Sequence, residues 1–222
     1  MKDGVPDSLT NGKDICAIVV TYHPDAEFPA RITRILRQVG ALVIVDNGSG
    51  EAATKMLGEL AENPVITLVL NLDNVGVASA LNFGIHHAVT RRFAWALLLD
   101  QDSCVNDDMV EDLLAVQAAF PHSAELAVIG SGFRDVNKES PEKSRDACAD
   151  PWEEVQYVIT SGSLIPSRPT PSSGPSGRNS LSTTSTSTIV SEREQRAFGS
   201  SKRESPSCHT RLVNTLGTVG CG

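Results

Sequence analysis

Residues 94–103 read AWALLLDQDS, an apolar run that ends in two carboxylates separated by one residue. A short, uniformly apolar run bounded by polar residues is typical of a strand that is buried on both faces of a parallel sheet. Runs of the same kind occur at Ile15–Thr21, Ala41–Val45 and Val65–Leu70. Together with Ala94–Leu99, these segments predict four buried strands.

Helix-like segments separate the predicted strands, because their apolar residues recur every three or four positions. This alternation of strand and helix predicts an α/β fold, with a mostly parallel sheet covered by helices on both faces. The predicted helices lie around residues 32–39, 52–61, 81–89 and 110–120, and the later strand candidates are Leu126–Ile129 and Val155–Thr160.

The charge and composition of the chain divide it near Pro166. The 222 residues carry a formal charge of −8, which argues against a nucleic-acid-binding protein. Residues 167–222 are rich in Ser, Thr and Pro, and the run over residues 167–188 has no hydrophobic period, so the segment predicts a disordered tail. We therefore expect a flexible N-terminus over residues 1–14, a folded core over residues 15–166 and a tail over residues 167–222.

The location of the protein is predicted from what the sequence lacks. No stretch approaches the ~20 apolar residues of a membrane span, and the first 14 residues contain no apolar signal-peptide core. The five cysteines lack the paired spacing of a zinc site or a disulfide framework. These features predict a cytoplasmic protein without a disulfide framework.

Polar residues follow each predicted strand, at the edge where open α/β sheets bind their ligands. Asp100 and Asp102 come directly after a buried strand. Mg²⁺ and Mn²⁺ prefer such oxygen ligands and often bind them together with substrate phosphates. The pair therefore predicts a metal–diphosphate site, with a solvated acidic loop or a helix cap as the alternative.

Three other loops could contribute to a ligand site, and each also has a plainer explanation. Asp46 and Asn47 begin a turn (DNGSG) whose carboxylate could bind a base or a ribose. Gly76 belongs to a segment of small residues, which lets the backbone approach an anion or lets a helix pack tightly on the sheet. Gly162 lies in a Ser/Gly turn that could contact a bound sugar.

Five segments in this order resemble glycosyltransferase family 2, and in particular its rhamnosyltransferase-like members. The resemblance implies a GT-A fold, a nucleotide-sugar donor and a divalent metal, Mg²⁺ or Mn²⁺. It also implies inverting transfer of a deoxysugar, typically rhamnose from dTDP-rhamnose, to a cell-surface polysaccharide or a lipid-linked acceptor. Family members often work at the cytoplasmic face of the membrane, which implies peripheral membrane association. The five segments, between Ile15 and Pro166, are AIVVTYHPD, VIVDNGS, NVGVASALNFGI, LLLDQDS and ITSGSLIP.

The resemblance also assigns roles to residues. Asp102 would be the more direct metal ligand, together with Asp100, and the metal would neutralise the departing diphosphate. Asp46 would hold the base or the ribose, and Gly162 would line the sugar pocket. The residues assigned to the nucleotide sugar are Thr21, Tyr22, Asp46, Asn47, Gly76, Asn82, Asp100 and Gly162.

The catalytic base is not identified, because the family places it beyond the position of Pro166, in a segment rich in Phe, Glu and Asp. Residues 167–222 contain no Asp. Codons built from the last base of one codon and the first two of the next let residues 176–188 encode FREEFFIDYVDID, which resembles that segment. We interpret this as a frameshift near Pro166, in the gene or in its sequence record, and expect weak or absent transfer.

Two other functions fit parts of the sequence. A non-catalytic interaction protein would use the Ser/Thr-rich tail as its working part. A sugar nucleotidyltransferase also binds nucleotides on an α/β sheet, but no Gly-rich loop with Arg and Lys follows the first predicted strand.

Overall fold

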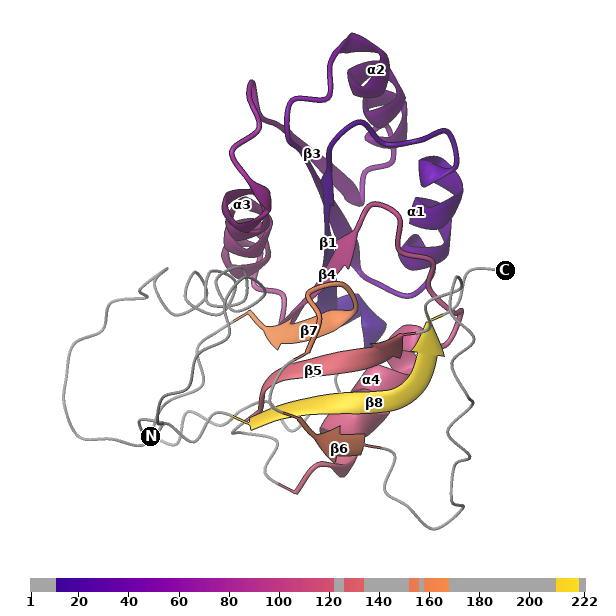
Figure 1. Ribbon diagram of the computed structural model, residues 1–222, viewed down its shortest axis with the longest axis vertical. Coiled ribbons are helices and arrows are strands. Elements are labelled where there is room, and N and C mark those ends of the chain that lie inside the picture. Colours follow the sequence, from indigo (N-terminus) through magenta and orange to yellow (C-terminus); the bar gives the residue numbers. More distant parts are fainter. Residues whose placement is uncertain (1–10, 122–125, 134–151, 156–157, 168–210, 220–222) are drawn as a thin grey trace, which may run out of the picture.

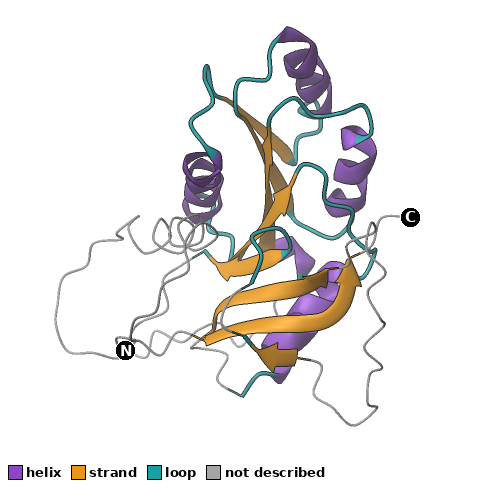
Figure 2. Ribbon diagram, in the orientation of Figure 1, coloured by secondary structure: helices purple, strands orange, loops and turns teal. Residues whose placement is uncertain are grey.

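The computed structural model shows a single mixed sheet with helices on both of its faces (Figures 1 and 2). The strand order is β3-β2-β1-β4-β7-β5-β8-β6. None of the described helices has the length and apolarity needed to cross a membrane. The structure describes residues 11–121, 126–133, 152–155, 158–167 and 211–219.

The first four strands are parallel and form one half of the sheet. Strand β1 is central, pairing with β2 on one side and with β4 on the other, and β2 pairs in turn with β3. The strands begin and end within one residue of the four predicted apolar runs, which confirms the α/β prediction for this half. Their bounds are Ile15–Thr21 for β1, Ala41–Asp46 for β2, Ile66–Leu70 for β3 and Trp95–Asp100 for β4.

Helices bury both faces of this parallel half, as the uniformly apolar strands require. Helix α3 covers one face, where its Ala80 and Leu81 pack with Ile18 of β1. Helices α1 and α2 lie on the opposite face, where Phe28 and Leu57 belong to a second apolar cluster (Figure 1). The helices are α1 Phe28–Leu36, α2 Glu51–Leu60, α3 Val77–Thr90 and α4 Met109–Ala119, and a short 3₁₀ turn, η1, spans Gly12–Asp14.

The second half of the sheet is mixed. Strand β7 (Ser163–Pro166) runs antiparallel to β4 and also to β5 (Leu126–Phe133). Strand β8 (Arg211–Val219) runs parallel to β5, and β6 (Trp152–Glu154) runs antiparallel to β8. Helix α4 packs against β5 and β8 (Figure 1). Strand β8 belongs to the segment for which the sequence predicts a tail; residues 168–210 of that segment lie outside the described residues.

The predicted strand over Val155–Thr160 is wrong at its described residues, and residues 156–157 lie outside them. Val155 and residues 158–160 have no strand pairing, and β6 and β7 lie on either side of them. Val158 is nevertheless buried, in the apolar cluster beneath α3. A short apolar run can therefore mark a buried loop, because burial alone does not distinguish a loop from a strand.

The two described cysteines differ in their chemical state. Cys16 of β1 is a free, buried thiol, and its burial raises its pKa to about 12. A buried thiol of this kind is inert as a nucleophile. Cys104 is disulfide-bonded.

Candidate functional site

The strand order places a topological switch point between β1 and β4. From β1 the chain proceeds to β2 and β3 on one side, and then returns to add β4 on the other. Ligands of open α/β sheets bind at such a point, outside the carboxyl ends of the strands. Thr21 pairs with Asp46, and Val20 pairs with Asp100, so the three strands end at the same edge. Asp46 and Asp100 therefore lie two strand spacings apart, or about 10 Å.

Asp46 is a buried carboxylate that organises the loop after β2. Its Oδ1 accepts hydrogen bonds from the Thr21 hydroxyl, at 2.9 Å, and from the Ser49 hydroxyl. Its Oδ2 accepts a hydrogen bond from the Ser49 amide at 3.0 Å. Both Asp46 and Thr21 are almost completely excluded from solvent. Their side chains thus hold the two loops together, and the expected contact of these residues with a nucleotide stays a prediction.

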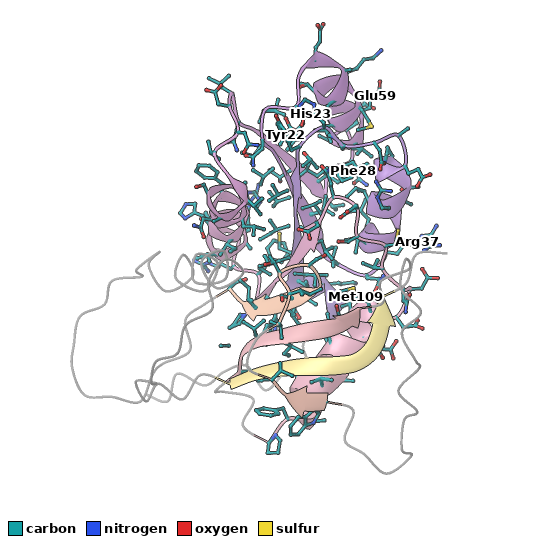
Figure 3. All side chains as sticks on the ribbon, viewed as in Figure 1. Tyr22, His23, Phe28, Arg37, Glu59 and Met109 are labelled. Atoms are coloured by element: carbon teal, nitrogen blue, oxygen red, sulfur yellow. The ribbon has the colours of Figure 1, made fainter. Side chains whose placement is uncertain are left out.

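The exposed part of the β1 loop consists of Tyr22 and His23. The Tyr22 side chain is half exposed, and its ring meets the edge of the His23 ring, with the centroids 4.2 Å apart. Figure 3 shows the two residues together at the upper end of the sheet. His23 has a φ of +52°, a conformation that few residues other than glycine adopt, and its amide donates to the Ser49 hydroxyl at 2.8 Å. The loop therefore presents an aromatic surface beside the switch point.

Asp100 and Asp102 lie close enough to influence one another at the end of β4. Partial burial, together with the negative charge of Asp102, raises the pKa of the Asp100 carboxyl. The Asp100 amide donates to the hydroxyls of Ser103 and Ser161, at 3.2 and 3.3 Å, which fixes the start of the loop. Asp102 itself is exposed to solvent.

This pair of repelling carboxylates suits a divalent cation, which would remove the repulsion. The described residues contain no cluster of three His, Cys, Asp or Glu side chains that could hold a metal alone. A cation at Asp100 and Asp102 would therefore need further oxygen ligands, from water or from a substrate. Mg²⁺ is commonly bound in this way, through one or two carboxylates plus substrate phosphates.

Gln101, between the two carboxylates, is a residue that the sequence analysis missed. Its side-chain amide makes two hydrogen bonds to the backbone of Tyr22, and its backbone carbonyl accepts a hydrogen bond from the Arg31 side chain. The β1 and β4 loops are therefore joined directly. No local pattern in the sequence marks this contact, because Gln101 and Tyr22 are 79 positions apart.

The loop after β3 leads into α3 at the same edge of the sheet. The side-chain Nδ2 of Asn71 donates to Oδ1 of Asn47 at 2.9 Å, which links this loop to the loop after β2. Gly76 is the N-cap of α3 with a φ of +83°, and a Cβ there would meet no atom within 4 Å. Asn82 lies in the first half of α3 and is partly buried.

Gly84 of α3, which belongs to the same segment of small residues, packs against the sheet. A Cβ at Gly84 would lie 2.3 Å from Cγ2 of Ile18. The glycine thus allows α3 to approach β1 closely, which is the plainer of the two explanations given above.

Gly162 forms a tight turn beside β4. Its φ is +78°, its amide donates to the Leu98 carbonyl at 2.8 Å, and its carbonyl accepts from the Ser131 amide at 2.8 Å. A Cβ at this position would lie 2.0 Å from the Ser131 hydroxyl oxygen. The neighbouring Ser161 contacts Asp100, so the turn lies next to the acidic loop.

Comparison with known proteins identifies both a family and a fold. Residues 16–179 match the family model described as Glycosyl transferase family 2. An uncharacterized glycosyltransferase of Haemophilus influenzae is 29% identical over 130 residues, which are 54% of this chain and 42% of that protein. The dTDP-rhamnosyl transferase RfbF of Shigella flexneri is 29% identical over 126 residues, which are 56% of this chain and 40% of that protein. The chain thus spans about two fifths of the length of these curated relatives.

Solved structures agree on the fold. The S. aureus TarS fragment 1–349 in complex with UDP-GlcNAc has a TM-score of 0.51 at 18% identity, covering 69% of this chain and 45% of that one. The structure of S. aureus TarS has a TM-score of 0.51 at 17% identity, covering 69% of this chain and 28% of that one. At such low identity the likeness concerns the fold alone.

Proposed function

The chain belongs to glycosyl transferase family 2, and on this premise we propose that it transfers a sugar from a nucleotide-sugar donor to an acceptor hydroxyl. The observation that carries the proposal is the convergence of the acidic β4 loop and the aromatic β1 loop at the switch point of the sheet. One loop offers ligands for a cation and the other offers a surface for a nucleoside.

Different residues of the chain would bind the cation and the nucleoside of the donor. Asp100 and Asp102 would hold a divalent cation, Mg²⁺ or Mn²⁺. When the cation is bound, it would neutralise charge on the departing diphosphate. Tyr22 would lie against the nucleoside, while Asp46 and Thr21 keep its loop in place from beneath. The acceptor hydroxyl would displace the nucleoside diphosphate with inversion at the anomeric carbon.

The donor that we propose is dTDP-rhamnose, and the acceptor a cell-surface polysaccharide or a lipid-linked glycan. The name of the Shigella flexneri relative, a dTDP-rhamnosyl transferase, supports this choice of donor. We propose that transfer takes place in the cytoplasm, at the inner face of the membrane.

We also propose that this chain transfers sugar weakly or not at all. A carboxylate must accept the acceptor's proton, and the family's base segment corresponds to the region after Pro166, which has no Asp. Sequencing the coding DNA around codon 166 tests the frameshift. An intact frame without a displaced family segment would refute it, and restoring the other frame should create activity.

Calorimetry with dTDP and Mn²⁺ tests donor binding independently of transfer. We expect dTDP to bind more tightly when Mn²⁺ is present, and we expect Asp102→Asn to remove most of that gain. Asp107→Asn is the matched control, because Asp107 is also an exposed carboxylate but lies at the far end of the same loop, next to the start of α4. Metal-dependent binding that survives Asp102→Asn would refute the proposed site.

A further inference from the structure

We propose that Gln101 is a positioning residue that couples the aromatic loop after β1, which contains Tyr22, to the acidic loop at the end of β4, which contains Asp100 and Asp102. This inference rests on the proposed function, because it concerns how the two halves of the donor site act together. Neither loop is attached to the other by strand pairing at this level, since the last paired residues of β1 and β4 are Val20 and Asp100.

The side chain of Gln101 bonds both backbone polar groups of Tyr22, as the backbone of a neighbouring strand would. The Tyr22 amide donates to Oε1 of Gln101 at 2.8 Å, and Nε2 of Gln101 donates to the Tyr22 carbonyl at 3.2 Å. One carboxamide thus satisfies both polar groups of the first residue beyond β1. A neutral amide can donate and accept at the same time, whereas a carboxylate only accepts and an ammonium only donates.

The backbone of Gln101 is fixed as well, from the side of α1. Nε of Arg31 donates to the Gln101 carbonyl at 3.0 Å. The Arg31 side chain is only 12% exposed, and its guanidinium pairs with Asp25 at 2.5 Å and with Glu27 at 3.4 Å. Gln101 is therefore held at both its backbone and its side chain, and it transmits the position of one loop to the other.

The consequence follows from the neighbours of Gln101 in the sequence. Asp100 and Asp102 flank it, so a cation that fixes these carboxylates also fixes the residue between them. A fixed Gln101 holds the Tyr22 backbone, and with it the ring that would meet the nucleoside. Binding at either loop should then favour binding at the other by the same factor, because coupling between two sites is reciprocal.

The chain contains a matched control. Gln38 makes a comparable pair of side-chain hydrogen bonds at the far end of the loop after β4, where α4 begins: its Nε2 donates to the Asn106 carbonyl at 2.8 Å, and its Oε1 accepts from the Val110 amide at 3.1 Å. It follows Arg37, which Figure 3 shows well away from Tyr22. Loss of the Gln38 amide should lower stability without removing either of the hydrogen bonds between Gln101 and Tyr22.

The experiment compares Gln101→Met and Gln38→Met in the full chain. Methionine has a similar length but lacks the strong donor and acceptor of the amide. Calorimetry gives the affinity for dTDP with and without Mn²⁺, and the ratio of the two is the coupling factor. We expect Gln101→Met to reduce this coupling factor about tenfold. Gln38→Met should leave the factor unchanged, although both variants should lower the melting temperature by similar amounts.

Hydrogen exchange measures the same coupling without a nucleotide. Mn²⁺ alone should slow exchange at the Tyr22 amide in the wild type and in Gln38→Met, but not in Gln101→Met. If Gln101→Met does not fold, Arg31→Lys replaces it, because lysine keeps the charge beside Asp25 and Glu27 but lacks the Nε donor. It should lower the factor in the same direction.

The outcomes separate this inference from the proposed function. Failure of the wild type to bind dTDP and Mn²⁺ would refute the proposed function and, with it, this inference. If the wild type binds both and the coupling factor is the same in Gln101→Met, the inference alone is overturned.

Discussion

Replacing Asp46 by alanine should loosen the loops at the donor site and destabilise the fold. The substitution removes the acceptor of three hydrogen bonds, from the Thr21 hydroxyl and from the amide and hydroxyl of Ser49. All three donors belong to residues that are almost entirely buried, so water does not readily replace the carboxylate. An unsatisfied buried donor costs about 1–3 kcal/mol. Some relaxation of the loops would reduce the sum, and we expect a loss of about 3 kcal/mol.

That loss is large enough to measure by thermal unfolding. For a chain of this size, 1 kcal/mol corresponds to a shift in melting temperature of roughly 2–4 °C, so Asp46→Ala should melt roughly 6–12 °C lower. Asp46→Asn should lose only about 1 kcal/mol, because the two hydroxyls can rotate to accept hydrogen bonds from the new amide. Asp73→Ala, at an exposed carboxylate in the next loop, is the control. A shift below roughly 2 °C for Asp46→Ala would contradict the view that this carboxylate holds the loops together.

Three further predictions concern the glycines and the acidic loop. Gly162→Ala should cost about 2 kcal/mol or more in the free energy of unfolding, because its Cβ would lie 2.0 Å from a serine hydroxyl. Gly76→Ala shares the positive φ without the clash and should cost about 1 kcal/mol. Equal losses for the two variants in urea unfolding would refute the role of the clash. Gly84→Ala should push α3 away from Ile18 and cost about 1–3 kcal/mol, and an unchanged urea midpoint would count against close helix–sheet packing. Because the pKa of Asp100 is raised, protons should compete with the cation at a higher pH than they would at an ordinary carboxyl. The affinity for Mn²⁺, measured by calorimetry, should therefore fall as the pH drops through that raised pKa. An affinity that is constant from pH 7 to about pH 4 would contradict this.

The parallel half of the sheet could be predicted from the sequence, because its strands are buried on both faces. Each strand therefore appears as an uninterrupted apolar run, as in Ile15–Thr21, and each run ends where the polar loop begins. In the mixed half, the predicted run Leu126–Ile129 is confirmed as the start of β5, but β6, β7 and β8 were not predicted. Val158 is as buried as a strand residue but lies in a loop, and β7 follows only after the tight turn at Gly162.

The positions of the candidate residues in the sheet could be predicted from the sequence, but their contacts could not. The acidic residues at the ends of β2 and β4 lie at one edge of the sheet, as parallel strands require. The sequence could not show that Asp46 is buried beneath its loop, because a turn-forming aspartate reads the same whether it faces inwards or outwards. It also could not show the contact between Gln101 and Tyr22, because long-range pairs leave no local pattern.

Diffraction from crystals soaked in dTDP and Mn²⁺ tests the central claim most directly, since the anomalous signal of manganese locates the cation. The account predicts a manganese peak between the carboxylates of Asp100 and Asp102, with the diphosphate bound to it and the thymidine beside Tyr22. A manganese peak elsewhere in the molecule, or a nucleotide bound away from the carboxyl ends of β1 and β4, would contradict it.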